Sequence, residues 1–154
     1  EAMSFASNSF DLIICTGVIE YLKSDEKAIA EITRVLKPNG VAFISSQNKI
    51  GPNSLIELIL SILPKNLRSK FVTIKQHHSH IPWKLSKELA KSGLEQEDFA
   101  YHHFYPLIIP FDRLFNKFCV RVGKKMERWH KRKIGWLLAT GFILMVKKKT
   151  EEKN

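Results

Sequence analysis

Short apolar runs alternate with amphipathic helical patterns along the first third of the chain. Phe10–Cys15 is an apolar run preceded by turn-forming residues, a pattern typical of a strand buried on both faces. Ser24 is a good helix N-cap, and apolar residues then recur at helical spacing as far as Leu36. Lys37–Gly40 contains the proline and glycine that end such a helix, and Val41–Ser45 follows as a second buried strand. A strand, helix, strand order predicts a parallel pair with a right-handed crossover.

The rest of the chain continues with helices and strands in turn. A proline in the first turn and a glycine at the end mark one of the helices. The expected elements are an apolar helix over Leu55–Leu63, a helix over Pro82–Gly93, and strands over Leu94–Tyr105 and Trp136–Val146.

Another helix is expected from Phe111 onward, and it is strongly amphipathic. Its apolar residues form one stripe, whereas its many lysines and arginines fall mostly elsewhere. Three interpretations stay open: a solvated helix with its stripe in the core, a membrane-surface patch, or a nucleic-acid footprint. No recognised nucleic-acid-binding module accompanies the charge, so no nucleic acid is expected as a partner. The stripe comprises Leu114, Phe115, Phe118, Val122, Met126 and Trp129.

Composition and charge refine this α/β picture. The 154 residues are 44% hydrophobic, enough for one compact core. Residues 1–50 hold five Lys/Arg against six Asp/Glu, a balance of −1, so with an overall charge of +10 the remainder holds +11. Cys15 and Cys119 lack metal-ligand or redox spacing and indicate reduced thiols of a cytoplasmic protein. We expect one domain over residues 1–149 and a polar tail over 150–154, with no signal peptide and no transmembrane helix.

Two segments carry a family resemblance. Phe10–Leu22 gives a Phe-Asp strand and a turn into Ile19-Glu20-Tyr21, and Glu31–Gly40 reads Glu-Ile-Thr-Arg-Val-Leu-Lys-Pro-Asn-Gly. In pattern and spacing these segments resemble the class I S-adenosylmethionine-dependent methyltransferases of the small-molecule type. Two positions depart from that pattern: Tyr21 stands where histidine is common, and Asn39 replaces the first of two glycines.

The resemblance implies a Rossmann-like methyltransferase sheet of which this chain supplies strands four to seven. Those strands are parallel with an antiparallel last strand, and helices cover both faces of the sheet. The family's Gly-x-Gly-x-Gly cofactor loop does not occur in this sequence. We therefore expect an N-terminally truncated domain whose first strand is a bare edge, so that the isolated chain aggregates or recruits a partner strand.

The resemblance also implies a site for S-adenosyl-L-methionine beside the end of the first strand. Cys15, Thr16, Gly17 and Val18 are the expected cofactor contacts. Glu20, Tyr21 and His77 would face the substrate, and His80 or His78 could remove a proton from the acceptor. A zinc site at these histidines is not expected, because no cysteine or acidic ligand accompanies them at suitable spacing.

The expected activity is methyl transfer to a small, lipophilic molecule by the intact parent protein, with the fragment alone inactive. The alternative is a non-catalytic methyltransferase-like module that binds a membrane surface or a protein partner through its basic helix. Under either interpretation the protein is cytoplasmic, with peripheral membrane contact as one of the partners considered.

Overall fold

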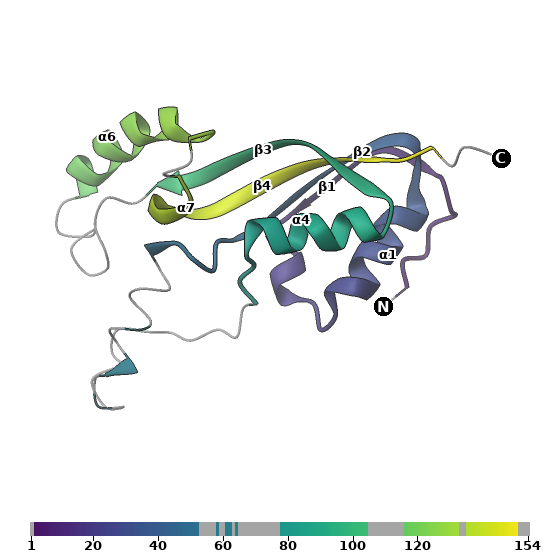
Figure 1. The fold of residues 1–154 in the computed structure, drawn as a ribbon, viewed down its shortest axis with the longest axis horizontal. Helices are drawn as coiled ribbons and strands as arrows, with labels where there is room; N and C mark the ends of the chain where they lie inside the picture. The colour runs from purple at the N-terminus through teal and green to yellow at the C-terminus, as the bar shows by residue number, and fades with distance from the viewer. Residues whose placement is uncertain are drawn as a thin grey trace.

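One mixed four-stranded sheet organises the chain (Figure 1). The structure is a computed structural model, and it describes residues 2–52, 58, 61–62, 64, 78–104, 116–132 and 135–150. The strand order is β1-β2-β4-β3. This is the order expected for strands four to seven of a methyltransferase sheet, so the predicted α/β fold class is confirmed. The strands are β1 (Phe10–Thr16), β2 (Leu36–Gln47), β3 (Leu94–Phe104) and β4 (Ala139–Lys148).

The predicted strand, helix, strand unit forms the first half of the sheet. β1 and β2 are parallel, with Leu12 opposite Val41 and Thr16 opposite Ser45. Helix α1 (Asp25–Val35) connects them, and Ser24 caps it by accepting a hydrogen bond from the Lys27 N–H at 3.4 Å. β2 starts directly after this helix, so the predicted stop over Lys37–Gly40 lies inside the strand, where Asn39 has a φ of 64°.

The second half of the sheet is antiparallel. β4 pairs with β2 on one side and with β3 on the other. Helix α4 (Pro82–Lys91) precedes β3, with proline at its start and Gly93 at a φ of 84° just past its end, as predicted. The last strand begins later than Trp136, because Gly135–Leu138 forms the short helix α7. That part of the predicted strand was wrong.

The core lies between the sheet and the two helices α1 and α4, which Figure 1 shows on the same side of the strands. Alternate residues of β2 and β4, such as Ile44 and Phe142, point toward these helices and are fully buried. They meet Ile29 and Ile32 of α1 and Leu85 and Leu89 of α4. The sheet and α1 with α4 therefore form one hydrophobic core.

β1 was expected to be buried on both faces, and this is wrong for the described chain. Leu12 and Ile14 are 52% and 67% exposed, because β1 lies at the edge of the sheet and its outer face has no cover among the described residues. The apolar composition of β1 is that of a central strand, whereas its position is that of an edge.

The basic helix is observed as α6 (Asn116–Met126), followed by the 3-10 turn η2 (Glu127–Trp129). Its buried face overlaps the predicted stripe only in part: Val122 and Met126 are half-buried beside buried Cys119 and Gly123, whereas Phe118 is 54% exposed. Gly123 faces the carbonyl oxygen of Phe104, so the helix approaches the end of β3 through a small residue. Leu114 and Phe115 lie outside the described residues, as does most of the predicted Leu55–Leu63 helix. Within the described ranges no helix is long and apolar enough to cross a bilayer.

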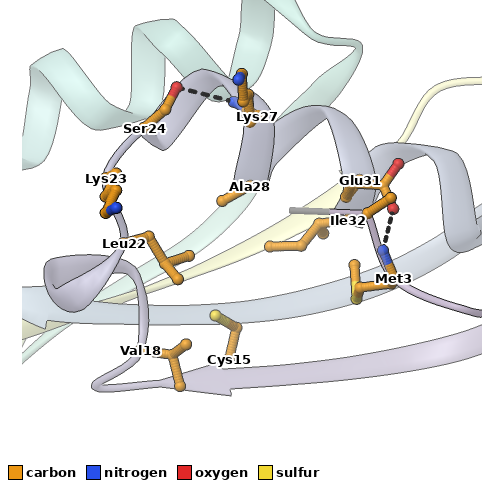
Figure 2. A pocket seen from close by; sticks show the side chains of 11 residues that line it. Met3, Cys15, Val18, Leu22, Lys23, Ser24, Lys27, Ala28, Glu31 and Ile32 are labelled. Carbon is orange, nitrogen blue, oxygen red and sulfur yellow. Dashed lines mark hydrogen bonds between the residues drawn. The ribbon is translucent and has the colours of Figure 1, made fainter.

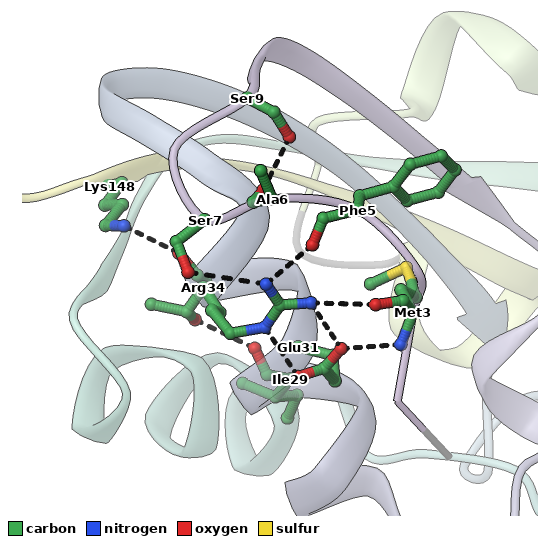
Figure 3. Close-up of polar contacts among 10 residues, drawn as sticks. Met3, Phe5, Ala6, Ser7, Ser9, Ile29, Glu31, Arg34 and Lys148 are labelled. Atoms are coloured by element: carbon green, nitrogen blue, oxygen red, sulfur yellow. Dashed lines mark hydrogen bonds and ion pairs between the residues drawn. The ribbon is translucent and has the colours of Figure 1, made fainter.

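The segment before β1 is fixed to α1 by Arg34 and Glu31 (Figure 3). The Arg34 guanidinium donates to the carbonyl oxygens of Met3 and Phe5 at 3.0 and 2.8 Å, and it pairs with Glu31 at 2.8 Å. Glu31 also accepts the Met3 N–H at 2.7 Å. At the other end of the chain, Lys148 of β4 donates to the Thr33 and Leu36 carbonyl oxygens and so caps the C-terminus of α1.

The exposed apolar edge of β1 predicts self-association of the isolated chain. We expect oligomers or aggregates at micromolar concentration and a shift to monomer on Ile14→Lys, because a lysine on an edge strand disfavours strand addition. Size-exclusion chromatography with light scattering measures both. Val120→Lys is the control, since Val120 is also an exposed apolar residue but lies on α6. A monodisperse wild-type monomer that melts cooperatively would contradict the prediction.

The contacts of Glu31 with Arg34 and with the Met3 N–H predict that acid destabilises the attachment of the segment before β1. Hydrogen bonds from Arg34 and then from the Met3 N–H lower the pKa of Glu31 from 4.5 to about 2. A lowered folded-state pKa stabilises the fold above pH 4.5, and the contribution is lost as the pH falls from 4.5 toward 2. In Glu31→Gln we expect the melting temperature to vary less with pH across this window. Glu88→Gln, at an exposed position of α4, is the control, and an unchanged pH profile in Glu31→Gln would refute the assignment.

Candidate functional site

The carboxyl ends of β1 and β2 lie side by side and bring the first candidate residues together. Thr16 is opposite Ser45, and the next residue, Gly17, donates its N–H to the Ser45 hydroxyl at 3.0 Å. Gly17 has a φ of 63°, a left-handed conformation that a glycine adopts without strain. A Cβ at position 17 would meet only the Glu20 carboxylate, at 4.0 Å, so there is open space beside this turn.

Two cavities flank the end of β1. The larger, of about 600 Å³, lies between the segment before β1, the end of β1 and α1. Figure 2 shows Cys15 and Val18 on one side of it and Leu22, Ala28 and Ile32 of the following segment on the other. The smaller, of about 430 Å³, contains Thr16 and Gly17 in its lining. The four predicted cofactor residues therefore divide between the two cavities, because successive residues of a strand point to opposite faces.

Cys15 is half-buried at the border of the larger cavity. Burial raises the pKa of its thiol, and a hydrogen bond from the Ile19 backbone only partly opposes this. The thiol therefore stays protonated at neutral pH, which suits a packing contact rather than a nucleophile.

Glu20 and Tyr21, the predicted substrate residues, lie in the short 3-10 turn η1 (Ile19–Tyr21). Glu20 is only 6% exposed and lines the smaller cavity, and its carboxylate accepts the Gln47 N–H at 3.0 Å. Its backbone oxygen accepts the His78 N–H at 2.9 Å. Tyr21 is 58% exposed and does not line either of these two cavities. The turn therefore places the acid inward and the aromatic ring outward.

His80 is buried between the sheet and the start of α1. Its Nδ1 lies 2.6 Å from the Ser46 hydroxyl and its Nε2 lies 2.9 Å from the Asp25 carboxylate. Main-chain hydrogen bonds also join His80 to Gln47 and Lys49 at 2.9 Å. Ser46 is 3% exposed and lies in the lining of the smaller cavity, with its hydroxyl already bonded to His80. The evident effect of these contacts is to hold the loop before α4 against the end of β2.

The other two predicted histidines have different positions. His78 is exposed and attached to η1 through its main chain, and it does not line either cavity described above. His77 lies outside the described residues. The catalytic assignments of His80 and His78 stay predictions.

Sequence reasoning missed several residues that the structure brings to this place. Ser45 and Gln47 line the smaller cavity, as do His102 and His103 of β3. The serines and glutamine had a usable signal, because they are the first polar residues after the apolar run of β2 and so mark its carboxyl end. His102 had no such signal, since it reaches this edge only through the pairing of β3 with β4.

The site offers features that suit S-adenosylmethionine. The larger cavity lies within the 300–1,000 Å³ range typical of small-molecule sites, and its lining is mostly apolar. The open space beside Gly17 allows close approach of a ligand to the backbone. Among the described residues no group of three His, Cys, Asp or Glu side chains could hold a metal ion.

Comparison with known proteins gives the same family for the N-terminal part. Residues 1–44 match the model of a methyltransferase domain. The chain is 27% identical over 103 residues to the ubiquinone biosynthesis O-methyltransferase of Thiobacillus denitrificans, covering 64% of this chain and 42% of that protein. It is 37% identical over 70 residues to the enzyme of the same name from Rickettsia prowazekii, covering 41% and 28%. The chain thus spans less than half the length of these relatives.

Solved structures extend the likeness to the remaining strands. A SAM-dependent methyltransferase from Methanosarcina mazei superposes with a TM-score of 0.58 at 16% identity, covering 97% of this chain and 64% of that one. The cyclase SpnF superposes with a TM-score of 0.56, also at 16% identity, covering 97% and 54%. At such identities the likeness concerns the fold alone. Residues 1–44 are thus similar in sequence to methyltransferase domains, and the described chain has the fold of S-adenosylmethionine-dependent methyltransferases.

Proposed function

We propose that this chain forms the acceptor side, and part of the cofactor side, of a site for S-adenosylmethionine-dependent methyl transfer to a small, lipophilic molecule. The observation that carries the proposal is the Thr16–Gly17 turn, which lies between two cavities. The larger cavity has a mostly apolar lining and suits an adenosyl group, and the smaller one combines polar side chains with apolar surface and suits an acceptor. The activity is proposed for the whole protein, because this chain spans less than half the length of its curated relatives.

Methyl transfer from a sulfonium is a direct displacement, so the protein mainly aligns the reactants and excludes water. Bound S-adenosylmethionine supplies the methyl group. Gly17 leaves room for a ligand beside the backbone, and its N–H is held by Ser45. Glu20 projects a buried carboxylate into the smaller cavity, held in place by the Gln47 N–H. This carboxylate can hydrogen-bond an acceptor hydroxyl and keep it oriented.

The predicted histidines have different roles in this proposal. Both ring nitrogens of His80 already have partners, Ser46 and Asp25, which favours a positioning part over proton removal. His78 and His77 remain candidates for contact with the acceptor, and Tyr21 is a candidate for stacking on it.

The names of the relatives support a lipophilic acceptor, and the volume of the smaller cavity supports a small one. The relatives are named for O-methylation in ubiquinone biosynthesis. The 430 Å³ cavity is of small-molecule size. From the O-methylation in the relatives' names, we propose that the acceptor of this protein is also methylated on oxygen.

Cofactor binding tests the proposal directly. Titration of S-adenosylhomocysteine by calorimetry should give heat with the full reading frame and none with this chain alone. In the full protein, Gly17→Val should weaken binding about tenfold or more, equivalent to about 1.4 kcal/mol, because a branched side chain fills the space beside the turn. Gly93→Val is the matched control, since Gly93 also has a positive φ and open surroundings but lies far along the chain, after α4. No heat from the intact wild-type protein would favour the non-catalytic alternative.

A second candidate function is peripheral attachment to an anionic membrane, and α6 favours it. Its exposed side carries Lys117, Arg121, Lys124 and Lys125, and none of these forms an ion pair with another described residue. By helical geometry, exposed Phe118 and Val120 flank this basic surface of α6 on its two sides. Cationic residues beside exposed apolar ones suit a lipid headgroup region.

Vesicle sedimentation checks this second function. We expect the chain to sediment with vesicles containing phosphatidylglycerol and not with pure phosphatidylcholine vesicles. Phe118→Ser and Lys124→Glu should each reduce sedimentation severalfold, with about 1 kcal/mol attributable to one cation near the surface. Lys87→Glu, on the exposed side of α4, is the control for charge alone. Equal sedimentation of the α6 variants and wild type would remove the membrane function.

A further inference from the structure

The smaller cavity extends across all four strands of the sheet. Its lining takes Thr16 from β1, Ser45 from β2, Gly141 from β4 and His102 from β3. Tyr101 and Phe142 belong to the core side, so their neighbours His102 and Gly141 face the opposite side of the sheet. One end of the cavity therefore lies at the proposed cofactor turn and the other at β3.

Two histidine rings meet at the β3 end, which an ordinary strand would not allow. Neighbouring strand residues point to opposite faces. His103, however, has a φ of 55°, and this left-handed backbone brings the two ring centroids to 4.5 Å. The Thr140 hydroxyl donates to the His103 carbonyl oxygen at 3.0 Å and holds that backbone in place. A non-glycine residue in this conformation carries a strain of order 1–3 kcal/mol, which is found most often at functional sites.

The two rings form one hydrogen-bonding unit. Their Nδ1 atoms are 2.7 Å apart, so one nitrogen donates and the other accepts. Burial, and then the neighbouring His103, lower the pKa of His102 despite an opposing hydrogen bond to the Phe142 backbone, and so favour the neutral form of this ring. Gly141 makes room for it, because a Cβ at position 141 would overlap the His102 ring. The pair is therefore a fixed, polar feature of the cavity wall.

Distance decides what this pair can do for methyl transfer. Three inter-strand spacings of about 4.8 Å put His102 roughly 14 Å from the Thr16–Gly17 turn. That is too far for contact with the atom that receives the methyl group. A small aromatic acceptor lying along the cavity would reach the pair with its opposite end.

The charge of the cavity lining indicates which chemical group of the acceptor would lie beside the histidine pair. None of the described lining residues is Lys or Arg, and the lining includes the Glu20 carboxylate, so an anionic group is disfavoured. A neutral hydroxyl can both donate to and accept from imidazole. Resting on the proposed function, we propose that the His102–His103 pair binds an uncharged hydroxyl at the end of the acceptor remote from the transferred methyl, and so determines acceptor specificity.

Binding of two matched probes tests this without requiring turnover. The probes are dihydroxybiphenyl and its analogue in which one hydroxyl is replaced by methyl. Each is titrated by calorimetry into the full reading frame, with and without S-adenosylhomocysteine. We expect the wild-type protein to prefer the dihydroxy probe by about tenfold, since the methyl analogue cannot make the hydrogen bond to imidazole that the hydroxyl makes.

Three variants test whether the preference for the dihydroxy probe arises from the histidine pair. His102→Phe and His103→Phe should each reduce it to about twofold, and Gly141→Ala should do the same by displacing the His102 ring. His130→Phe, an exposed histidine of the turn after η2, should leave it unchanged. S-adenosylhomocysteine affinity should be the same in all four variants, which separates lost specificity from misfolding.

Two results would overturn the inference: a wild-type protein without preference, or a preference that survives in both histidine variants. Failure of the wild-type protein to bind S-adenosylhomocysteine counts instead against the proposed function. In that case the preference between the two probes is judged from the titrations made without S-adenosylhomocysteine.

Discussion

The parallel pairing of β1 with β2 fixes the position of every residue proposed for the cofactor side. Because the two strands run the same way, their carboxyl ends meet at one edge, where Gly17 donates to Ser45 and Glu20 accepts from Gln47. The pairing also requires a crossover, and α1 provides it while burying Ile29 and Ile32 against the sheet. If the register slipped by one residue, the core side chains of β2 would turn to the opposite face of the sheet. The hydrogen bonds from Gly17 to Ser45 and from Gln47 to Glu20 would then be lost.

Local sequence patterns predicted the elements whose burial and spacing are regular. α1 and α4 have good start and stop signals, and both were found where the patterns placed them. Trp136–Leu138 was assigned to a strand because apolar residues continue into β4 without a break, and periodicity alone cannot separate a short helix from a buried strand there. Exposure of β1 was missed because composition shows what a strand is suited to contact, not whether that contact is present.

The site was predictable only where it follows local order. Cys15–Val18 spans the end of β1, and a turn at that point could be found from sequence together with the family resemblance. The contact of His80 with Asp25 joins residues 55 positions apart, and that of His102 with Gly141 depends on sheet pairing. Such distances in sequence leave no periodic signal. The cyclase SpnF shares this fold, so the shape of the sheet does not decide the chemistry, and the proposals rest on side chains in the cavities.

The place of β4 in the sheet has a consequence for how the chain acquires its structure. β4 follows β3 in the chain, yet it lies between β2 and β3 and separates them. During translation β3 therefore has no partner strand within the described sheet until β4 emerges, and the C-terminus of α1 lacks its cap until Lys148 has been added. Folding of this region must be late and dominated by contacts between residues far apart in sequence, which makes it slow. Unpaired strand edges stay exposed meanwhile, so assistance by a chaperone would matter most in the interval before β4 has emerged.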